Sequence, residues 1–222
     1  MKRKTFFVYF LALLTAFLFC GAFCAPEKNI YLTFDDGPSA KITPVILDIL
    51  AEQNIKATFF VIGKNAERNP DVLKRIFAEG HVVGIHSYTH EYKKIYRDER
   101  ALLDDIEKCE NAIRKINPAF SSKLYRFPGG SFGLSERFTE AVKSRGYRYV
   151  DWNASNGDCE IKDTDGGKEL AEYAIATGGK RGTIIMLMHD AAGKTATAES
   201  LNEIIGHYKK AGYAFKTLKT LR

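Results

Sequence analysis

The feature that most restricts the possible folds of this chain is a regular alternation of short apolar runs and amphipathic stretches from Asn29 onward. The apolar runs are typical of buried strands and lie at 30–34, 57–62, 82–85, 124–127, 147–152, 182–188 and 213–217. Helical periodicity between them predicts helices at 43–50, 70–79, 98–116, 135–145, 167–177 and 196–211. Strands that alternate with helices form parallel sheets. We therefore predict an α/β fold, a deformed TIM-like (β/α) barrel with about seven parallel strands; an open doubly wound sheet is the alternative.

Residues 1–25 differ from the rest of the chain. Lys2, Arg3 and Lys4 precede an uncharged, almost wholly apolar run, and a charged start before an apolar core is the pattern of an export signal. The run is also long enough to cross a bilayer as an uncleaved anchor. We expect a protein of the cell envelope or a secreted protein, with a signal peptide or N-terminal membrane anchor at 1–25 and one domain at 26–222.

The charge and the cysteines narrow the class of partner and the redox chemistry. Loss of the three leader cations lowers the formal net charge from +6 to +3. This mildly basic balance suits an anionic envelope polymer and does not indicate nucleic acid. Two of the four cysteines lie in the leader. Cys109 is in line with apolar helix positions, so we expect a buried thiol, with a disulfide to Cys159 as the alternative.

Polar side chains follow the predicted strands one after another. They are Asp35 and Asp36, His86 and His90, Arg126, Asp158, and His189 with Asp190. In parallel α/β folds the active site lies at the carboxyl ends of the strands, so these groups meet on one face. Each alone has a plain structural explanation; Asp36-Gly37-Pro38 would pass as a turn. Together they indicate a metal-dependent hydrolytic site, in which two histidines four residues apart both reach one ion.

These motifs resemble those of the polysaccharide deacetylases of carbohydrate esterase family 4, the NodB-homology fold. The matching segments are 33–38 (TFDDGP), 86–90 (HSYTH), 126–130 (RFPGG), the loop that ends at Asp158, and 187–189 (LMH). They occur in the family's order and cover nearly all of the chain after the leader. The resemblance implies a deformed (β/α) barrel that removes acetyl groups from N-acetylated sugars of a polymer, and so makes 26–222 a catalytic domain.

The resemblance also implies a metal centre. Its ligands would be Asp36, His86 and His90, and one carboxylate with two imidazoles matches a catalytic zinc site that keeps one position open. Such an ion lowers the pKa of bound water to about 7 and polarises a carbonyl. We expect one divalent ion, Zn²⁺ first, with Co²⁺ or Ni²⁺ as alternatives.

Four further residues take catalytic roles under the resemblance. Asp35 matches the general base, and Arg126 matches the arginine that holds this carboxylate ionised. A departing amine needs a proton, and His189 is the candidate acid because its charge state is easily poised near neutral pH. Asp158 matches the aspartate that orients this histidine, with Asp151 as the alternative.

The sequence departs from the family in two places that bear on substrate binding. Phe-Pro-Gly-Gly follows the arginine where many relatives carry a Pro-Tyr pair, so the oxyanion amide is expected from Gly129 or Gly130. Cys159 stands where a tryptophan is usual, and one wall of the cleft is therefore lost or supplied elsewhere. Leu187 and Trp152 are expected to line a pocket for the acetyl methyl group.

Other polar and aromatic residues receive structural explanations. Asp190 is expected to cap or orient its loop, His81 to be satisfied by backbone at the opposite end of the barrel, and the acidic cluster at 98–105 to form a solvated helix face. Tyr88 and Tyr92 either stack on sugar rings or pack in the core.

We predict a metal-dependent N-deacetylase whose partner is an acetylated glycan, first the N-acetylglucosamine of peptidoglycan and second chitin-like oligomers. A muramic acid substrate or an acetyl-xylan-type ester would use the same residues. A non-catalytic glycan-binding protein would lack a ligand, base or acid, and none is missing. A phosphoesterase would usually need further ligands for a second metal, and the sequence offers no clear candidate. We expect a monomer that touches a membrane only through an uncleaved leader.

Overall fold

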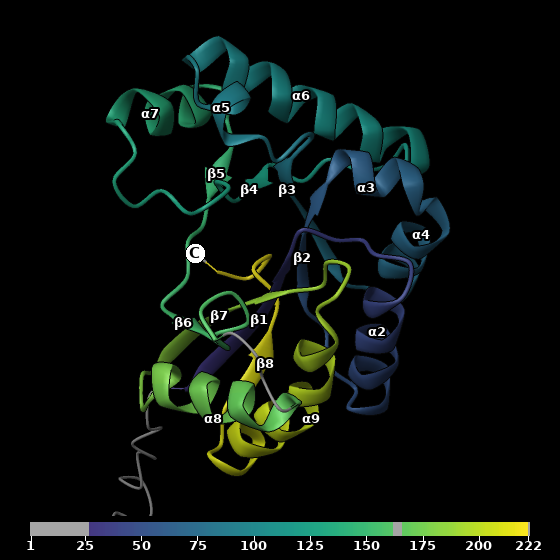
Figure 1. The fold of residues 1–222 in the computed structure, drawn as a ribbon, viewed down its shortest axis with the longest axis vertical. Coiled ribbons are helices and arrows are strands. Elements are labelled where there is room, and N and C mark those ends of the chain that lie inside the picture. The colour runs from purple at the N-terminus through teal and green to yellow at the C-terminus, as the bar shows by residue number, and fades with distance from the viewer. Residues whose placement is uncertain (1–26, 162–165, 222) are drawn as a thin grey trace, which may run out of the picture.

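The computed structural model of the chain describes residues 27–161 and 166–221 (Figure 1). The predicted leader lies outside these residues. Eight strands form one parallel sheet: β1 (Asn29–Asp35), β2 (Thr58–Ile62), β3 (Val82–Ser87), β4 (Leu124–Tyr125), β5 (Arg148–Tyr149), β6 (Ala154–Ser155), β7 (Thr183–His189) and β8 (Ala214–Lys216). The strands follow the order β5-β4-β3-β2-β1-β7-β6, and β8 pairs with the first residues of β1.

Helices cover the outside of this curled sheet (Figure 1). They are α2 (Ile42–Glu52), α3 (Gly63–Arg68), α4 (Pro70–Ala78), α5 (Tyr92–Ile95), α6 (Glu99–Ile116), α7 (Glu136–Ser144), α8 (Gly167–Gly178) and α9 (Thr195–Lys210). The longest, α6, begins where the Asp98 carboxylate accepts the Ala101 N–H at 2.7 Å, as an N-cap does. It buries Leu102, Ile106 and Cys109 against the sheet. The buried thiol predicted for Cys109 is confirmed, and both described cysteines are free.

The period of two along β1 separates the helix-packed face from the barrel interior. Ile30, Leu32 and Phe34 belong to the large core beneath the helices. Tyr31 points to the other face, in a smaller cluster with Phe60, Leu124, Val150 and Leu218. Thr33 and Asp35 follow Tyr31 on the same face, so the interior becomes polar toward the carboxyl ends of the strands. The polar end of the barrel interior is therefore where a functional site is expected.

The predicted barrel is confirmed, with differences in its smallest parts. The strand order runs from β5 to β1 without the reversal that a doubly wound sheet requires. Among the described residues no pairing joins β5 to β6, so the barrel is open there. The sequence did not predict β6, because two residues carry no periodicity. It also did not predict α3 and α5, because helices of six and four residues show little periodicity.

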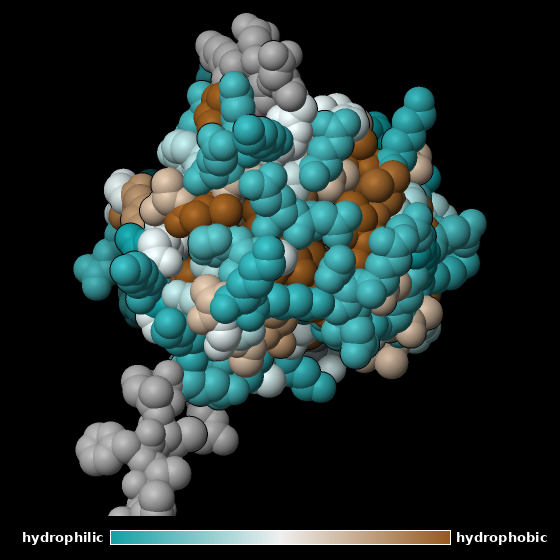
Figure 2. Space-filling model, turned by 90° about the horizontal axis from the view of Figure 1, so that it is seen from below, coloured by the Kyte–Doolittle hydropathy of each residue, from teal (hydrophilic) through white to brown (hydrophobic). Residues whose placement is uncertain are grey.

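Seen from the side of α8 and α9, hydrophilic residues dominate, with smaller hydrophobic areas between them (Figure 2). Within 27–161 and 166–221, no helix has both the length and the apolar character that crossing a bilayer demands.

Candidate active site

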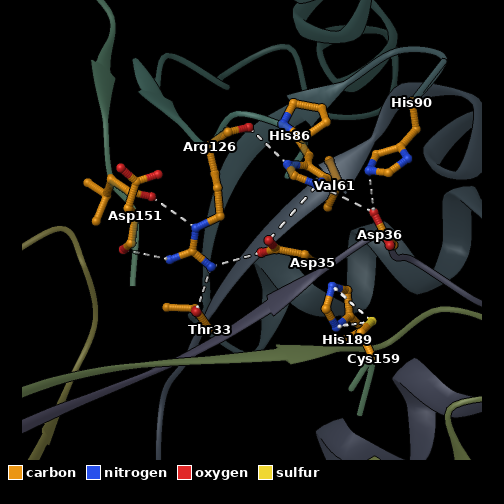
Figure 3. Close-up of polar contacts among 12 residues, drawn as sticks. Thr33, Asp35, Asp36, Val61, His86, His90, Arg126, Asp151, Cys159 and His189 are labelled. Carbon is orange, nitrogen blue, oxygen red and sulfur yellow. Dashed lines mark hydrogen bonds and ion pairs between the residues drawn. The ribbon is translucent and has the colours of Figure 1, made fainter. Parts of the chain in front are cut away.

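Asp36, His86 and His90 converge at the carboxyl ends of β1 and β3, and both imidazoles point toward the carboxylate (Figure 3). The Asp36 Oδ1 atom lies 3.4 Å from Nε2 of His86 and 3.2 Å from Nε2 of His90. Asp36 and His90 have φ angles of 73° and 58°. Residues other than glycine rarely adopt this left-handed backbone conformation, and strained backbone of this kind concentrates at functional sites.

The donor set fits a divalent cation. Nδ1 of His86 donates to the Arg126 carbonyl at 2.9 Å. This leaves the lone pair of Nε2 free on the side that faces the Asp36 carboxylate, as in metal-binding histidines. Asp36 Oδ1 is buried without a hydrogen-bond partner, although buried acceptors normally have one. Burial opposes ionisation of Asp36, but the neighbouring imidazoles of His86 and His90 hold its pKa below the usual range. An ionised, unpartnered carboxylate beside two imidazole nitrogens has the ligand types that a divalent cation such as zinc would bind.

A carboxylate on α6 holds the histidine loop in shape. Asp105 Oδ2 accepts from the Ser87 hydroxyl at 2.6 Å and from the Tyr88 N–H at 2.7 Å. Its Oδ1 accepts from both the N–H and the hydroxyl of Thr89. Ser87 Oγ in turn accepts the His90 N–H at 2.8 Å. The prediction of a merely solvated acidic face was therefore wrong for Asp105, whose role depends on a loop that only the fold brings to the helix.

Asp35 and Arg126 form a buried ion pair beside the metal ligands. Asp35 is 2% exposed and Arg126 is fully buried; Oδ1 lies 3.0 Å from Nη1. The same Nη1 donates to Thr33 Oγ1 at 2.7 Å, and Nε donates to the Val150 carbonyl at 2.9 Å. The guanidinium also lies 4.3 Å from the centre of the Phe60 ring. Burial lowers the pKa of Arg126, but guanidinium stays charged in proteins. Asp35 is thus fixed in one position.

His189, at the end of β7, pairs with Asp158. Its Nδ1 donates to Asp158 Oδ1 at 2.7 Å, and its backbone N–H donates to Oδ2 at 2.8 Å. Burial opposes a charged imidazole, but the Asp158 hydrogen bond and then the Cys159 contact raise the pKa of His189 to about 11. Burial likewise opposes ionisation of Asp158, yet His189 lowers its pKa. Asp151, the alternative partner, accepts instead from the Ser131 N–H at 2.9 Å.

The glycine pair after Arg126 lies beside the aromatic side chains of Tyr92, Phe132 and Trp152. The Gly130 N–H donates to the Phe127 carbonyl at 2.8 Å. The Gly129 N–H finds no acceptor within the described residues. Leu187 is buried two residues before His189 on the same face of β7. Trp152 is half-buried and contacts Phe132 edge to face, with 5.5 Å between ring centres.

The glycines make room for aromatic side chains from other segments. A Cβ atom at Gly129 would lie 3.0 Å from Tyr92, and one at Gly130 would lie 2.9 Å from both Phe132 and Trp152. Tyr92 is 48% exposed and Phe132 is 65% exposed. Tyr92 also meets the His90 ring edge to face at 5.3 Å. Phe132 was not predicted from the sequence. The available signal was an aromatic residue that follows a glycine pair.

The structure also shows the surroundings of the other polar and aromatic residues considered in the sequence. Tyr88 donates to Glu67 and lies beneath the Lys108 ammonium, so of the two tyrosines only Tyr92 faces the cleft. Asp190 is buried against the turn at Gly37 and accepts from Thr43 at 2.6 Å, consistent with an orienting role. Nδ1 of His81 accepts the Ala57 N–H at the amino end of β3, as predicted, but its Nε2 is buried without a hydrogen-bond partner.

Comparisons with known proteins agree with this geometry. A family model described as polysaccharide deacetylase matches residues 23–150. A peptidoglycan-N-acetylglucosamine deacetylase of Bacillus cereus is 35% identical over 86% of this chain and 69% of its own length. The peptidoglycan-N-acetylmuramic acid deacetylase PdaA of Bacillus subtilis is 32% identical over 88% and 72% of the two chains.

Solved structures carry the same likeness. A Streptococcus mutans CE4 esterase superposes with a TM-score of 0.80 at 32% identity, over 86% of each chain. The catalytic domain of a peptidoglycan N-acetylglucosamine deacetylase from Eubacterium rectale gives a TM-score of 0.79 at 33% identity, over 87% of this chain and 90% of that one. Motifs, fold and comparisons lead to one conclusion: this chain belongs to the polysaccharide deacetylases of carbohydrate esterase family 4, which are hydrolases.

Proposed function

We propose that this protein is a metal-dependent deacetylase of peptidoglycan that removes the acetyl group from N-acetylglucosamine. The observation that carries the proposal is the unpartnered, buried Asp36 Oδ1 between two histidine nitrogens, next to the Asp35–Arg126 pair. The relatives named above act on the N-acetylglucosamine or N-acetylmuramic acid of peptidoglycan, which supports this polymer as the first choice of substrate.

Asp36, His86 and His90 would hold one divalent ion, Zn²⁺ in the first instance and Co²⁺ or Ni²⁺ as alternatives. When bound, such an ion polarises the amide carbonyl and activates water. Two imidazoles with one carboxylate suit zinc, cobalt and nickel better than magnesium or calcium, which prefer oxygen ligands.

Asp35 is the general base. It removes a proton from the attacking water while the remaining hydroxyl adds to the acyl carbon of the acetamide. The ion pair with Arg126 holds the carboxylate in place and stops it from turning toward the metal ligands. Thr33 and the Val150 carbonyl fix the guanidinium in its turn.

The Gly129 N–H donates to the oxyanion that forms on the former carbonyl oxygen, because the Gly130 N–H is already engaged. Leu187 and Trp152 line the side where the methyl group rests. The C–N bond then breaks as His189 gives its Nε2 proton to the departing nitrogen. Asp158 holds the Nδ1 proton and the ring orientation. Acetate and a free amino sugar result.

We place this reaction at the cell envelope. Residues 1–25 would serve as signal peptide or anchor, and 26–222 would be the catalytic domain, acting as a monomer. A product with free amino groups would make the glycan more cationic.

Acetate release by the purified protein tests the proposal. Substrates are intact peptidoglycan, N-acetylglucosamine oligomers and acetylated xylan, each with added Zn²⁺ and with a chelator. We expect metal-dependent release, fastest from peptidoglycan. Faster release from the oligomers would favour a chitin-like substrate, and faster release from xylan an O-deacetylase. Metal bound without release from any substrate would point to glycan binding alone.

A further inference from the structure

Three side chains of metal-ligand type lie together on the acid side of the cleft, separate from the Asp36 group. Nδ1 of His189 is 3.5 Å from Sγ of Cys159 and 2.7 Å from Oδ1 of Asp158. One ligand atom from each residue lies within 4.8 Å of the other two. The thiol is exposed and faces the ring of His189 (Figure 3), so an ion from solvent reaches the sulfur first and the more buried His189 and Asp158 after it.

The spacing is close to that of a tetrahedral ion. With zinc–ligand distances of 2.0 to 2.3 Å, a coordinated imidazole nitrogen and thiolate sulfur lie about 3.6 Å apart, and a nitrogen and carboxylate oxygen about 3.3 Å apart. The Cys159–His189 separation already matches. The Asp158–His189 hydrogen bond needs to lengthen by about 0.6 Å to reach that spacing, which small side-chain rotations supply.

We propose that Asp158, Cys159 and His189 form a second metal site, which binds a thiolate-preferring divalent ion such as Zn²⁺, Co²⁺ or Cd²⁺ and thereby inhibits the protein. The ion takes the place of the Nδ1 proton of His189 and of the Cys159 thiol proton, and both protons pass to solvent. His189 then changes from an imidazolium, a proton donor, to a neutral ligand. The inhibition, though not the binding, rests on the proposed role of His189 as the acid.

A neighbouring lysine makes this site weaker than the Asp36 group. Nζ of Lys194 lies 3.3 Å from the Cys159 sulfur and 2.6 Å from the Asp158 carbonyl. Its positive charge repels an arriving cation. Asp158 and His189 already satisfy each other, whereas Asp36 Oδ1 has no hydrogen-bond partner. The first ion therefore goes to Asp36, and only excess metal fills the second site.

Cobalt titration of the metal-free full-length protein tests the proposal. We expect two equivalents to bind, the second accompanied by the ultraviolet charge-transfer absorption of a cobalt–thiolate bond. In Cys159→Ser this absorption disappears and the second equivalent binds at least about tenfold more weakly, while the first is unchanged. Replacement of the chain's other three cysteines by alanine, at Cys20, Cys24 and Cys109, keeps both ions and the absorption. In Asp36→Asn the thiolate absorption develops with the first equivalent that binds.

Inhibition gives the second readout. Acetate release should rise with the first equivalent of Zn²⁺ and fall with the second in the wild type, and Cys159→Ser should lose only the fall. Binding of a single equivalent without thiolate absorption would overturn the proposal, as would equal absorption in Cys159→Ser. A protein that shows the thiolate absorption but releases no acetate with one equivalent would keep this site and contradict the proposed function instead.

Discussion

The two sides of the cleft use similar residues in different states. The metal side, Asp36, His86 and His90, contains a buried carboxylate oxygen without a hydrogen-bond partner and two residues in left-handed conformations. On the acid side, Asp158 accepts from the side chain and backbone of His189 and from Thr197. The first arrangement is incomplete without a cation, whereas the second is satisfied by its own proton. A carboxylate–histidine pair whose hydrogen bonds are left open therefore binds an ion first, whereas a pair that satisfies its own hydrogen bonds must give up its proton before it can bind one.

The largest effect on activity is expected from a substitution of Asp35, the proposed general base, which lies between the two sides. Asp35→Asn removes the proton acceptor but keeps an oxygen for Arg126, so we expect kcat to fall by about 10²–10⁴-fold with the ion retained. Loss of the carboxylate charge beside a buried guanidinium lowers stability, by up to about 3–5 kcal/mol. Acetate release, metal content and thermal unfolding of the same preparation measure the three quantities.

Asp36→Asn is the matched variant for that experiment. It changes the adjacent carboxylate in the same way but is expected to lose the ion as well as the activity. If Asp35→Asn lost the ion and Asp36→Asn retained it, the roles of the two aspartates would have to be exchanged.

The second effect concerns the protonation of His189, the proposed general acid. Burial opposes a charged imidazole, but Asp158, followed by Cys159, raises the pKa of His189 to about 11, so the ring stays protonated through neutral pH. Asp158→Asn removes that support, and the pKa of His189 falls. Activity that requires the protonated ring is then lost as pH rises through the lower value. We expect a loss of about 10²-fold in kcat/KM at alkaline pH and a smaller loss at acidic pH.

The pH profile of kcat/KM measures this shift, and the metal content should not change. Asp151→Asn is the control, since Asp151 interacts with Ser131, and its alkaline limb should stay in place. An alkaline limb that does not move in Asp158→Asn would remove His189 from the role of acid.

The third effect concerns the hydrogen bonds to Asp105 that support the loop of His86 and His90, and their contribution to metal affinity. Asp105→Ala removes the acceptor of four hydrogen bonds from the histidine loop. Residues that support metal ligands in this way contribute about 10- to 100-fold in metal affinity, and we expect a loss of that size in a competition titration with a chelator. Asp104→Ala, on the exposed face of the same helix, should change the affinity little. Equal losses in both variants would mean that general charge, not the loop contact, sets the affinity.

Asp105 also shows what the sequence does and does not predict. Motif residues at strand ends were placed together from the sequence because the ends of parallel strands share one face. The alternation of strands and helices was enough to predict the barrel. The contact of Asp105 with a loop 16 to 18 residues earlier depends on how α6 packs, and helix periodicity assigns that position to solvent. Asp151 and Asp158 both follow the fifth strand in sequence, and only the loop path distinguishes them.

The smallest effect is expected where the glycine pair leaves space beside the metal ligands. Tyr92 occupies that space and is half exposed, so we expect it to contact the sugar ring. Losing an aromatic contact of about 1 kcal/mol raises KM about fivefold, with kcat little changed, in Tyr92→Ala; Tyr92→Phe should keep the contact. Val45→Ala, a similarly exposed apolar side chain on α2, is the control. A fall in kcat at unchanged KM would instead assign Tyr92 to positioning His90, whose ring it meets edge to face, and would move it from the substrate wall to the metal side.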